Sequence, residues 1–385
     1  MQSARFMHNV SRLGLAILCL GSLLLAFSSN AAPIASEEPA AKISRTLSSA
    51  DTSAAATPQK PRFIALILPQ TSRALGPAAE AVRTGFLAGA MADGRRAVPF
   101  RLYPIDDEGA TLTAAYRKAI AEGALAVVGG VTRDGASVIA REGAPVPTLA
   151  LNAPPEGAVP ENFYFVSLSL EHEARFLARE TITDNKKRAV ILAGTSALAK
   201  RLADSFEKEW LAKRGEIVGR LTVGSEVADG LKIKASFEKW RDVSLVFIAL
   251  DAKAARLLRP YLPNAIPIYA TSHSLNPYAG VIENRDLDGV RYLEMPWFVE
   301  RDHLAVMSYA RPSADLPLDY ERLYALGIDA WRLTQLVMTD ERARNLPSLD
   351  GVTGKLTLDS GNQFVRSLTQ LEMRDGQPRA LSSAP

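Results

Sequence analysis

The sequence has one cysteine and four histidines in 385 residues. Cys19 lies inside an apolar run from Leu13 to Phe27, and we expect it to be removed with that segment, leaving a mature chain without disulfides. No G-x-S-x-G motif indicates a serine nucleophile, and the few histidines show no metal-ligand spacing. The mature chain is therefore predicted to be stabilised by packing, to need no metal or cofactor, and not to be an enzyme.

An excess of charge of one sign is also missing. The chain carries 45 lysines and arginines against 42 aspartates and glutamates, and it has no long basic block. A nucleic-acid-binding protein normally presents a concentrated basic face. The composition therefore excludes nucleic acid as an expected partner.

The apolar run is too short to predict a membrane span, which needs about 20 apolar residues. Arg5 and Arg12 precede the run, and small and polar residues follow it, which is the order of a secretory signal peptide. We expect a signal peptide over residues 1–31 and a periplasmic mature chain. The alternatives are an uncleaved membrane anchor and an outer-membrane lipoprotein acylated at Cys19.

Residues 32–60 are rich in alanine, serine, threonine and proline and contain almost no large apolar side chains. Such a segment cannot bury enough apolar surface to offset the entropy lost on ordering, so we expect a flexible tether. The remaining chain, from Pro61 onward, is long enough for two lobes of ordinary domain size.

Short apolar runs alternate with helical patterns along this remaining chain. Strands alternating with helices predict parallel sheets, and the series is long enough for two α/β lobes, followed by a C-terminal β-hairpin. A continuous apolar stripe over 320–331 predicts a helix that packs on its own sheet. The expected strands are 62–68, 100–105, 124–128, 148–151, 163–168, 189–193, 217–223, 243–250, 266–270, 355–359 and 364–373.

Several short strings occur in an order that resembles the LpoA/LppC family of penicillin-binding-protein activators. Each string alone is weakly specific, but their succession covers nearly the whole chain after residue 60. The strings are Ile64-Ala-Leu-Ile-Leu-Pro69, Leu149-Ala-Leu-Asn152, Tyr164-Phe-Val-Ser-Leu168, Phe206-Glu-Lys-Glu-Trp210, Tyr269-Ala-Thr-Ser272, Glu294-Met-Pro296, Tyr324-Ala-Leu-Gly-Ile-Asp-Ala-Trp331 and Gly351-Val-Thr-Gly-Lys-Leu356.

The resemblance implies a two-lobed type I periplasmic-binding fold with three crossovers between the lobes. Lobe one would comprise residues 61–168 and 294–345, and lobe two residues 169–293 and 346–380. It also implies an outer-membrane lipoprotein that binds a class A penicillin-binding protein and stimulates peptidoglycan cross-linking. Longer family members carry a helical-repeat domain where this sequence has only the tether.

A second interpretation is a solute-binding protein for an amino-acid-like or small anionic ligand, as in ABC transport. Ligands of open α/β sheets lie beyond the carboxyl ends of the strands. In amino-acid-binding relatives of the fold, hydroxyls and backbone amides hold the carboxylate, and an acid in the second lobe holds the ammonium. The loops at those ends contain the candidate ligand-binding residues Thr71, Ser72, Thr132, Arg133, Asn152, Ser272 and His273.

These candidates do not make a complete amino-acid anchor. Thr132 and Asn152 could hold a carboxylate, with Arg133 as a further anion partner, although turn and helix-cap chemistry explains the first two equally well. The loop around Ser272 contains no acid to pair with an ammonium group. Burying an unpaired charge is costly. The sequence therefore favours a protein partner over a zwitterionic solute.

Overall fold

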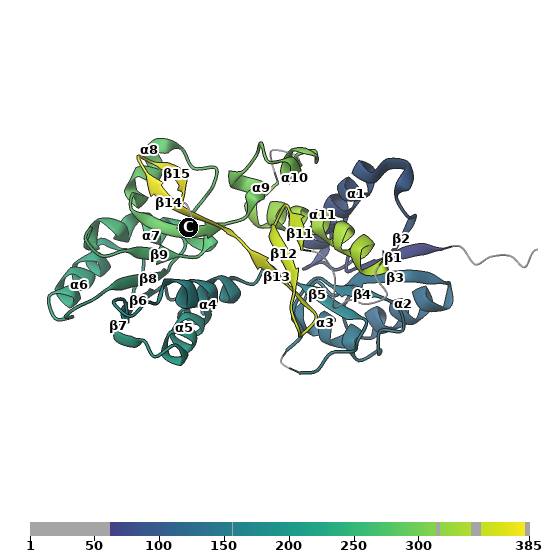
Figure 1. The fold of residues 1–385 in the computed structure, drawn as a ribbon, viewed down its shortest axis with the longest axis horizontal. Coiled ribbons are helices and arrows are strands. Elements are labelled where there is room, and N and C mark those ends of the chain that lie inside the picture. Colours follow the sequence, from purple (N-terminus) through teal and green to yellow (C-terminus); the bar gives the residue numbers. More distant parts are fainter. Residues whose placement is uncertain (1–61, 156, 313–315, 340–347, 382–385) are drawn as a thin grey trace, which may run out of the picture. The chain divides into compact units, whose positions relative to one another are not determined.

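The computed structural model describes residues 62–155, 157–312, 316–339 and 348–381 (Figure 1). The predicted signal peptide over 1–31, with Cys19, and the predicted tether over 32–60 lie outside these residues. None of the helices in the described ranges combines the length and apolar content needed to cross a membrane. The described residues belong to one compact unit that contains two sheets.

The first sheet has eight strands in the order β11-β12-β13-β5-β4-β3-β1-β2. Its first five strands in chain order are parallel, β13 adds to β5 in parallel, and β11, β12 and β13 pair antiparallel. The strands are β1 (Phe63–Leu68), β2 (Phe100–Pro104), β3 (Ala124–Gly129), β4 (Thr148–Ala150), β5 (Phe163–Val166), β11 (Leu349–Gly351), β12 (Gly354–Leu358) and β13 (Gln363–Ser367).

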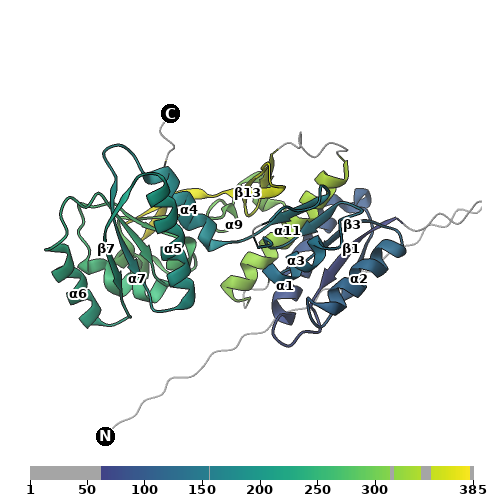
Figure 2. The same ribbon diagram turned by 90° about the horizontal axis from the view of Figure 1, so that it is seen from below.

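Helices cover both faces of this sheet (Figures 1 and 2). Successive side chains of a strand point to opposite faces, so the alternate residues of β1 enter two different cores. Ile64 packs with α1 (Gly76–Asp93) and α11 (Leu318–Thr339), whereas Ala65 packs with α2 (Ala110–Ala121) and α3 (Arg133–Ala140). We call the first sheet and these helices the first lobe.

The two helices on one face of the first lobe, α1 and α11, approach each other through glycines. A Cβ atom built on Gly85 would lie 1.9 Å from the backbone oxygen of Tyr324, and one built on Gly327 would lie 2.2 Å from that of Val82. The predicted apolar stripe over 320–331 lies in α11, where Tyr324, Ile328 and Trp331 are buried. The expectation that this stripe packs in the protein's own core is confirmed.

The second sheet has seven strands in the order β15-β14-β10-β9-β8-β6-β7. The strands β6 to β10 are parallel, β14 pairs antiparallel with β10, and β15 forms a C-terminal hairpin with β14. The strands are β6 (Arg188–Ala193), β7 (Glu216–Thr222), β8 (Leu245–Ala249), β9 (Ile268–Ala270), β10 (Val290–Glu294), β14 (Thr369–Arg374) and β15 (Gln377–Ala380).

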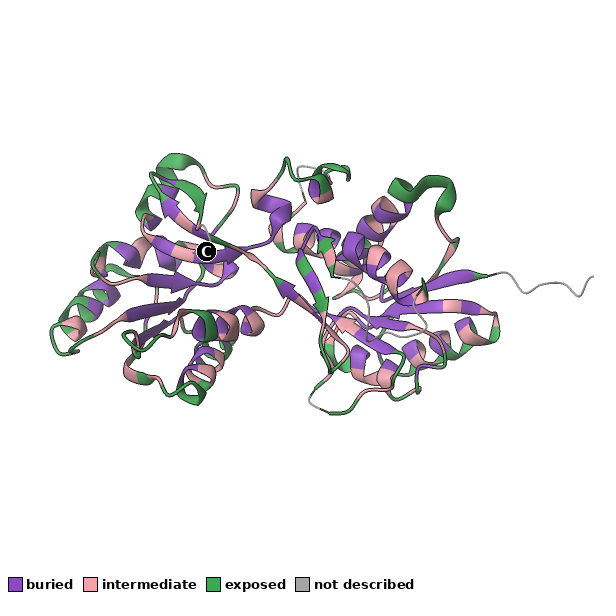
Figure 3. Cartoon of the chain, viewed as in Figure 1, coloured by how far each residue is buried: buried purple, intermediate pink, exposed green. Residues whose placement is uncertain are grey.

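Helices α4 (Leu170–Thr181) and α5 (Ala197–Ala212) cover one face of the second sheet, and α6 (Val227–Phe237) and α7 (Ala252–Leu258) cover the other. We call this sheet and its helices the second lobe. Every residue of β1 and of β8 is buried (Figure 3), as expected for central strands of parallel sheets. The two-lobed α/β fold predicted from the sequence is confirmed.

The chain passes between the sheets three times, from β5 to α4, from β10 to α9 (Pro296–Val299), and from β13 to β14. The assignment of residues 346–380 as a whole to lobe two is wrong for β11 to β13. These strands extend the first sheet because β13 pairs with β5, and only β14 and β15 join the second sheet. The run 364–373, predicted as one strand, is divided between the two sheets.

Candidate functional site

Thr132, a predicted ligand-binding residue, caps a helix and binds a carboxylate of its own chain. Its Oγ1 accepts a hydrogen bond from the backbone N–H of Gly135, at the start of α3, and donates one of 2.5 Å to Glu108. The same carboxylate accepts bonds of 2.8 Å from the backbone N–H groups of Val131 and Thr132. Glu108 thus occupies the position where a ligand carboxylate would bind this loop.

Three further candidates of the first lobe have different surroundings. The amide of Asn152 donates from Nδ2 to the backbone oxygen of Val131 and accepts at Oδ1 from the N–H of Ala153. The hydroxyl of Ser72 accepts from the N–H of Leu75 just before α1. Thr71 lines a separate pocket beside β2 and α2. The structure therefore does not bring all the predicted residues together.

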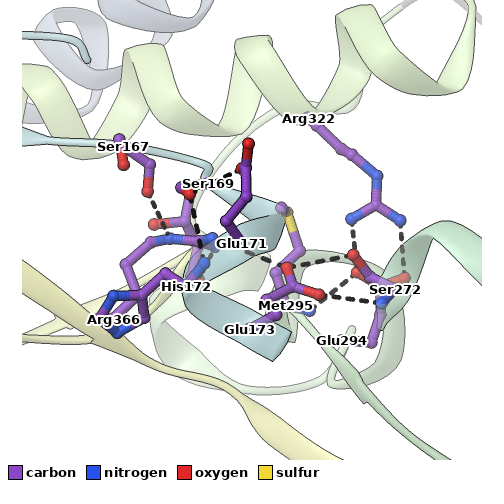
Figure 4. Close-up of polar contacts among 11 residues, drawn as sticks. Ser167, Ser169, Glu171, His172, Glu173, Ser272, Glu294, Met295, Arg322 and Arg366 are labelled. Carbon is purple, nitrogen blue, oxygen red and sulfur yellow. Dashed lines mark hydrogen bonds and ion pairs between the residues drawn. The ribbon is translucent and has the colours of Figure 1, made fainter. Parts of the chain in front are cut away.

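In the second lobe, Ser272 is buried against an acid that the sequence analysis did not connect with its loop. Its backbone N–H and its Oγ donate hydrogen bonds of 2.9 and 3.1 Å to Glu173 of α4 (Figure 4). The neighbouring His273 is partly buried, and this burial lowers the pKa of its imidazole. An acid is therefore present at this loop, but the chain already uses it.

Arg133 and Asn152 line a pocket of about 470 Å³. The pocket also contains Glu171 and Arg201, which were not expected from the sequence because they lie in the helices α4 and α5 rather than in loops. Oε1 of Glu171 accepts from Arg133 at 3.1 Å and from Arg201 at 2.9 Å, and Oε2 accepts from Ser169 at 3.0 Å. We call this group of residues the arginine pocket.

Glu171 is the shared acceptor of the arginine pocket. Burial raises the pKa of its carboxyl, but hydrogen bonds from its own backbone N–H, Arg201 and Ser169 outweigh burial and hold the pKa below the ordinary value. The carboxylate is therefore ionised at neutral pH. It already accepts three side-chain hydrogen bonds and has little capacity left to bind a ligand cation.

A second polar group, the crossover cluster, consists of Glu173, Ser272, Glu294, Arg322 and Arg366 (Figure 4). Arg322 of α11 donates two hydrogen bonds of 2.8 Å to Glu294 at the end of β10. Arg366 of β13 donates to the backbone oxygen of Ser167 and lies 3.8 Å from Glu173. Glu173, Glu294 and Arg366 lie in α4, β10 and β13, which each adjoin one of the three crossovers, so the cluster connects the crossovers.

The charges of the crossover cluster are shielded from solvent. Burial raises the pKa of Glu173, and the guanidinium of Arg366 opposes that shift. Burial also lowers the pKa of Arg366. Because buried charges are tolerated when they are paired and hydrogen-bonded, these contacts give the cluster a structural role.

Comparisons with known proteins identify the family to which this chain is similar. A family model described as "LppC putative lipoprotein" matches residues 50–220 and 222–376. The penicillin-binding protein activator LpoA from Enterobacter sp. (strain 638) is 26% identical over 299 residues, which cover 66% of this chain and 41% of that protein. The chain therefore spans less than half the length of this curated relative.

Two solved structures share the fold. The C-domain of LpoA from Haemophilus influenzae is 20% identical, with a TM-score of 0.68 and coverage of 83% of this chain and 99% of that chain. A "putative branched-chain amino acid ABC transporter" from Chromobacterium violaceum ATCC 12472 is 35% identical, also with a TM-score of 0.68, and the match covers 82% of this chain and 100% of that chain.

Proposed function

We propose that this chain, which belongs to the LppC lipoprotein family, is a non-catalytic periplasmic regulator that binds a class A penicillin-binding protein and stimulates its peptidoglycan cross-linking. The family resemblance drawn from the sequence is confirmed. Relatives of this chain are named penicillin-binding protein activators, and the H. influenzae LpoA C-domain is described as a regulator of PBP1A. These names are the source of the proposed partner.

The observation that carries the proposal is that two residues expected to hold an amino-acid ligand are instead bonded to carboxylates of the chain itself. Thr132 is bonded to Glu108, and Ser272 is bonded to Glu173. An incoming carboxylate at Thr132 would meet the carboxylate of Glu108, and an ammonium group would have to compete with Ser272 and Arg366 for Glu173. This arrangement favours a protein partner over an amino-acid solute, although the fold is shared with a described ABC transporter.

The test is a binding and activity measurement on the whole chain after its predicted signal peptide. The immobilised protein is expected to retain a class A penicillin-binding protein from a membrane extract of its own organism and to raise cross-linking by that purified synthase. A solute-binding protein of the same fold, immobilised at equal density, is the control. Failure to retain or stimulate any class A synthase of the organism would remove the proposal.

A further inference from the structure

The arginine pocket is lined by apolar side chains as well as by two arginines. Its apolar side chains come from both lobes, since Leu198 lies in α5 and Leu323 and Leu326 lie in α11. The volume of about 470 Å³ falls within the range typical of small-molecule sites.

The two guanidinium groups keep hydrogen-bonding capacity after they bind Glu171. Arg133 donates from one terminal nitrogen, and Arg201 donates from Nε. A guanidinium has five N–H donors, and the other donors of these two groups have no acceptor among the residues that the structure describes. Each arginine side chain is 54% exposed, so a ligand can reach it.

The charges of the residues that line the pocket determine which sign of ligand charge it favours. Two guanidinium groups share the single carboxylate of Glu171, which leaves an excess of one positive charge. Glu171 extends away from Glu173 in Figure 4, where it is bonded to Ser169. An anionic group can therefore bind without a second cation, whereas an ammonium group finds no free acid in the lining.

We propose that the arginine pocket binds a small amphipathic anion, with one carboxylate or phosphate group held by Arg133 and Arg201 and an apolar body against the leucines. Arginine pairs well with both kinds of group because its planar N–H donors match two oxygen atoms. Arg133 belongs to the first lobe and Arg201 to the second, so the bound anion would bridge them. This inference is independent of the proposed synthase partner.

The test compares probes that share one apolar body. Isothermal titration calorimetry of the whole chain after its predicted signal peptide would use 4-methylpentanoate, leucine, 4-methylpentanamide and 3-methylbutyl phosphate. We expect the carboxylate or the phosphate to bind, and the stronger of the two identifies the anionic group. The uncharged amide and the zwitterion leucine are expected to bind at least about tenfold more weakly, because the amide lacks the charge and leucine adds an unpaired ammonium.

Variants locate the binding. Arg133→Gln and Arg201→Gln should each weaken binding of the preferred anion about tenfold or more, since each removes a positive charge and a charge-assisted hydrogen bond to the anion. Arg117→Gln is the matched control, because Arg117 pairs with Glu142 on the surface outside the pocket. Folding of each variant is checked by circular dichroism. Three results would overturn the proposal. They are that neither anion binds, that the amide binds as tightly as the preferred anion, or that neither pocket variant weakens binding.

Discussion

Replacing Glu294 by glutamine tests whether the crossover cluster contributes to stability through its charges. Glu294 is 1% exposed, and both of its oxygens accept from Arg322, whose side chain is 14% exposed. The substitution keeps the shape but leaves a buried guanidinium without its carboxylate. Removing one partner of such a pair costs about 3–5 kcal/mol. Glu173 also favours the charged form of Arg322 and would partly compensate for the lost carboxylate. We therefore expect Glu294→Gln to lower the free energy of unfolding by about 3 kcal/mol, the lower end of this range.

The matched control is Glu80→Gln at a pair of the same chemistry on the surface. Glu80 also accepts two hydrogen bonds from one arginine, Arg83, but these side chains are 50% and 30% exposed. Exposed pairs contribute about 0–1 kcal/mol. The free energy of unfolding would be measured by urea denaturation for both variants. Equal losses, within about 0.5 kcal/mol, would refute the reasoning that burial makes the Glu294–Arg322 pair important.

Two further predictions concern helix packing and pH. Gly327→Ala should lower the free energy of unfolding by about 1–3 kcal/mol or more, because the added Cβ would lie 2.2 Å from a backbone oxygen of α1. The control is Gly280→Ala, whose Cβ meets nothing within 4 Å. It should cost about 0.5 kcal/mol in the same urea assay. Burial, followed by neighbouring arginines, lowers the pKa of His172 to about 4. Between pH 6.5 and 4 the unfolded chain therefore binds more protons, and His172 contributes a loss of up to about 3 kcal/mol as pH falls. His172→Gln should show a smaller loss of unfolding free energy between pH 7 and 4.5, and an unchanged loss would contradict this assignment.

The fold could be predicted largely from local patterns, because strands buried on both faces are continuous apolar runs and the helices between them show one apolar face. The division of residues 364–373 between the two sheets could not be predicted in this way. Both halves of that run are ordinary strand sequence, and what separates them is pairing, since β13 joins β5 and β14 joins β10. Pairing with a strand about 200 residues earlier leaves no signal in the run itself.

The candidate site was harder to predict because its important contacts cross long distances in the chain. Thr132 was open to interpretation as a cap, but its partner Glu108 lies in a loop 24 residues earlier. The acid missing from the loop around Ser272 is supplied by Glu173, 99 residues away. Arg201 could not be predicted from the loops at the strand ends, because it lies within helix α5.

These long-range partners change the interpretation of the candidate residues in the loops after the strands. A threonine or a serine after a strand looks free in the sequence, yet Thr132 and Ser272 both donate to carboxylates of the same chain. A ligand carboxylate at Thr132 would have to displace Glu108 and leave that charge in a largely buried position, which is costly. The guanidinium groups of Arg133 and Arg201 still have donors to offer and an excess positive charge. In the proposed site these two guanidinium groups would bind a simple anion, even though the residues expected to hold an amino acid are bonded to carboxylates of the chain itself.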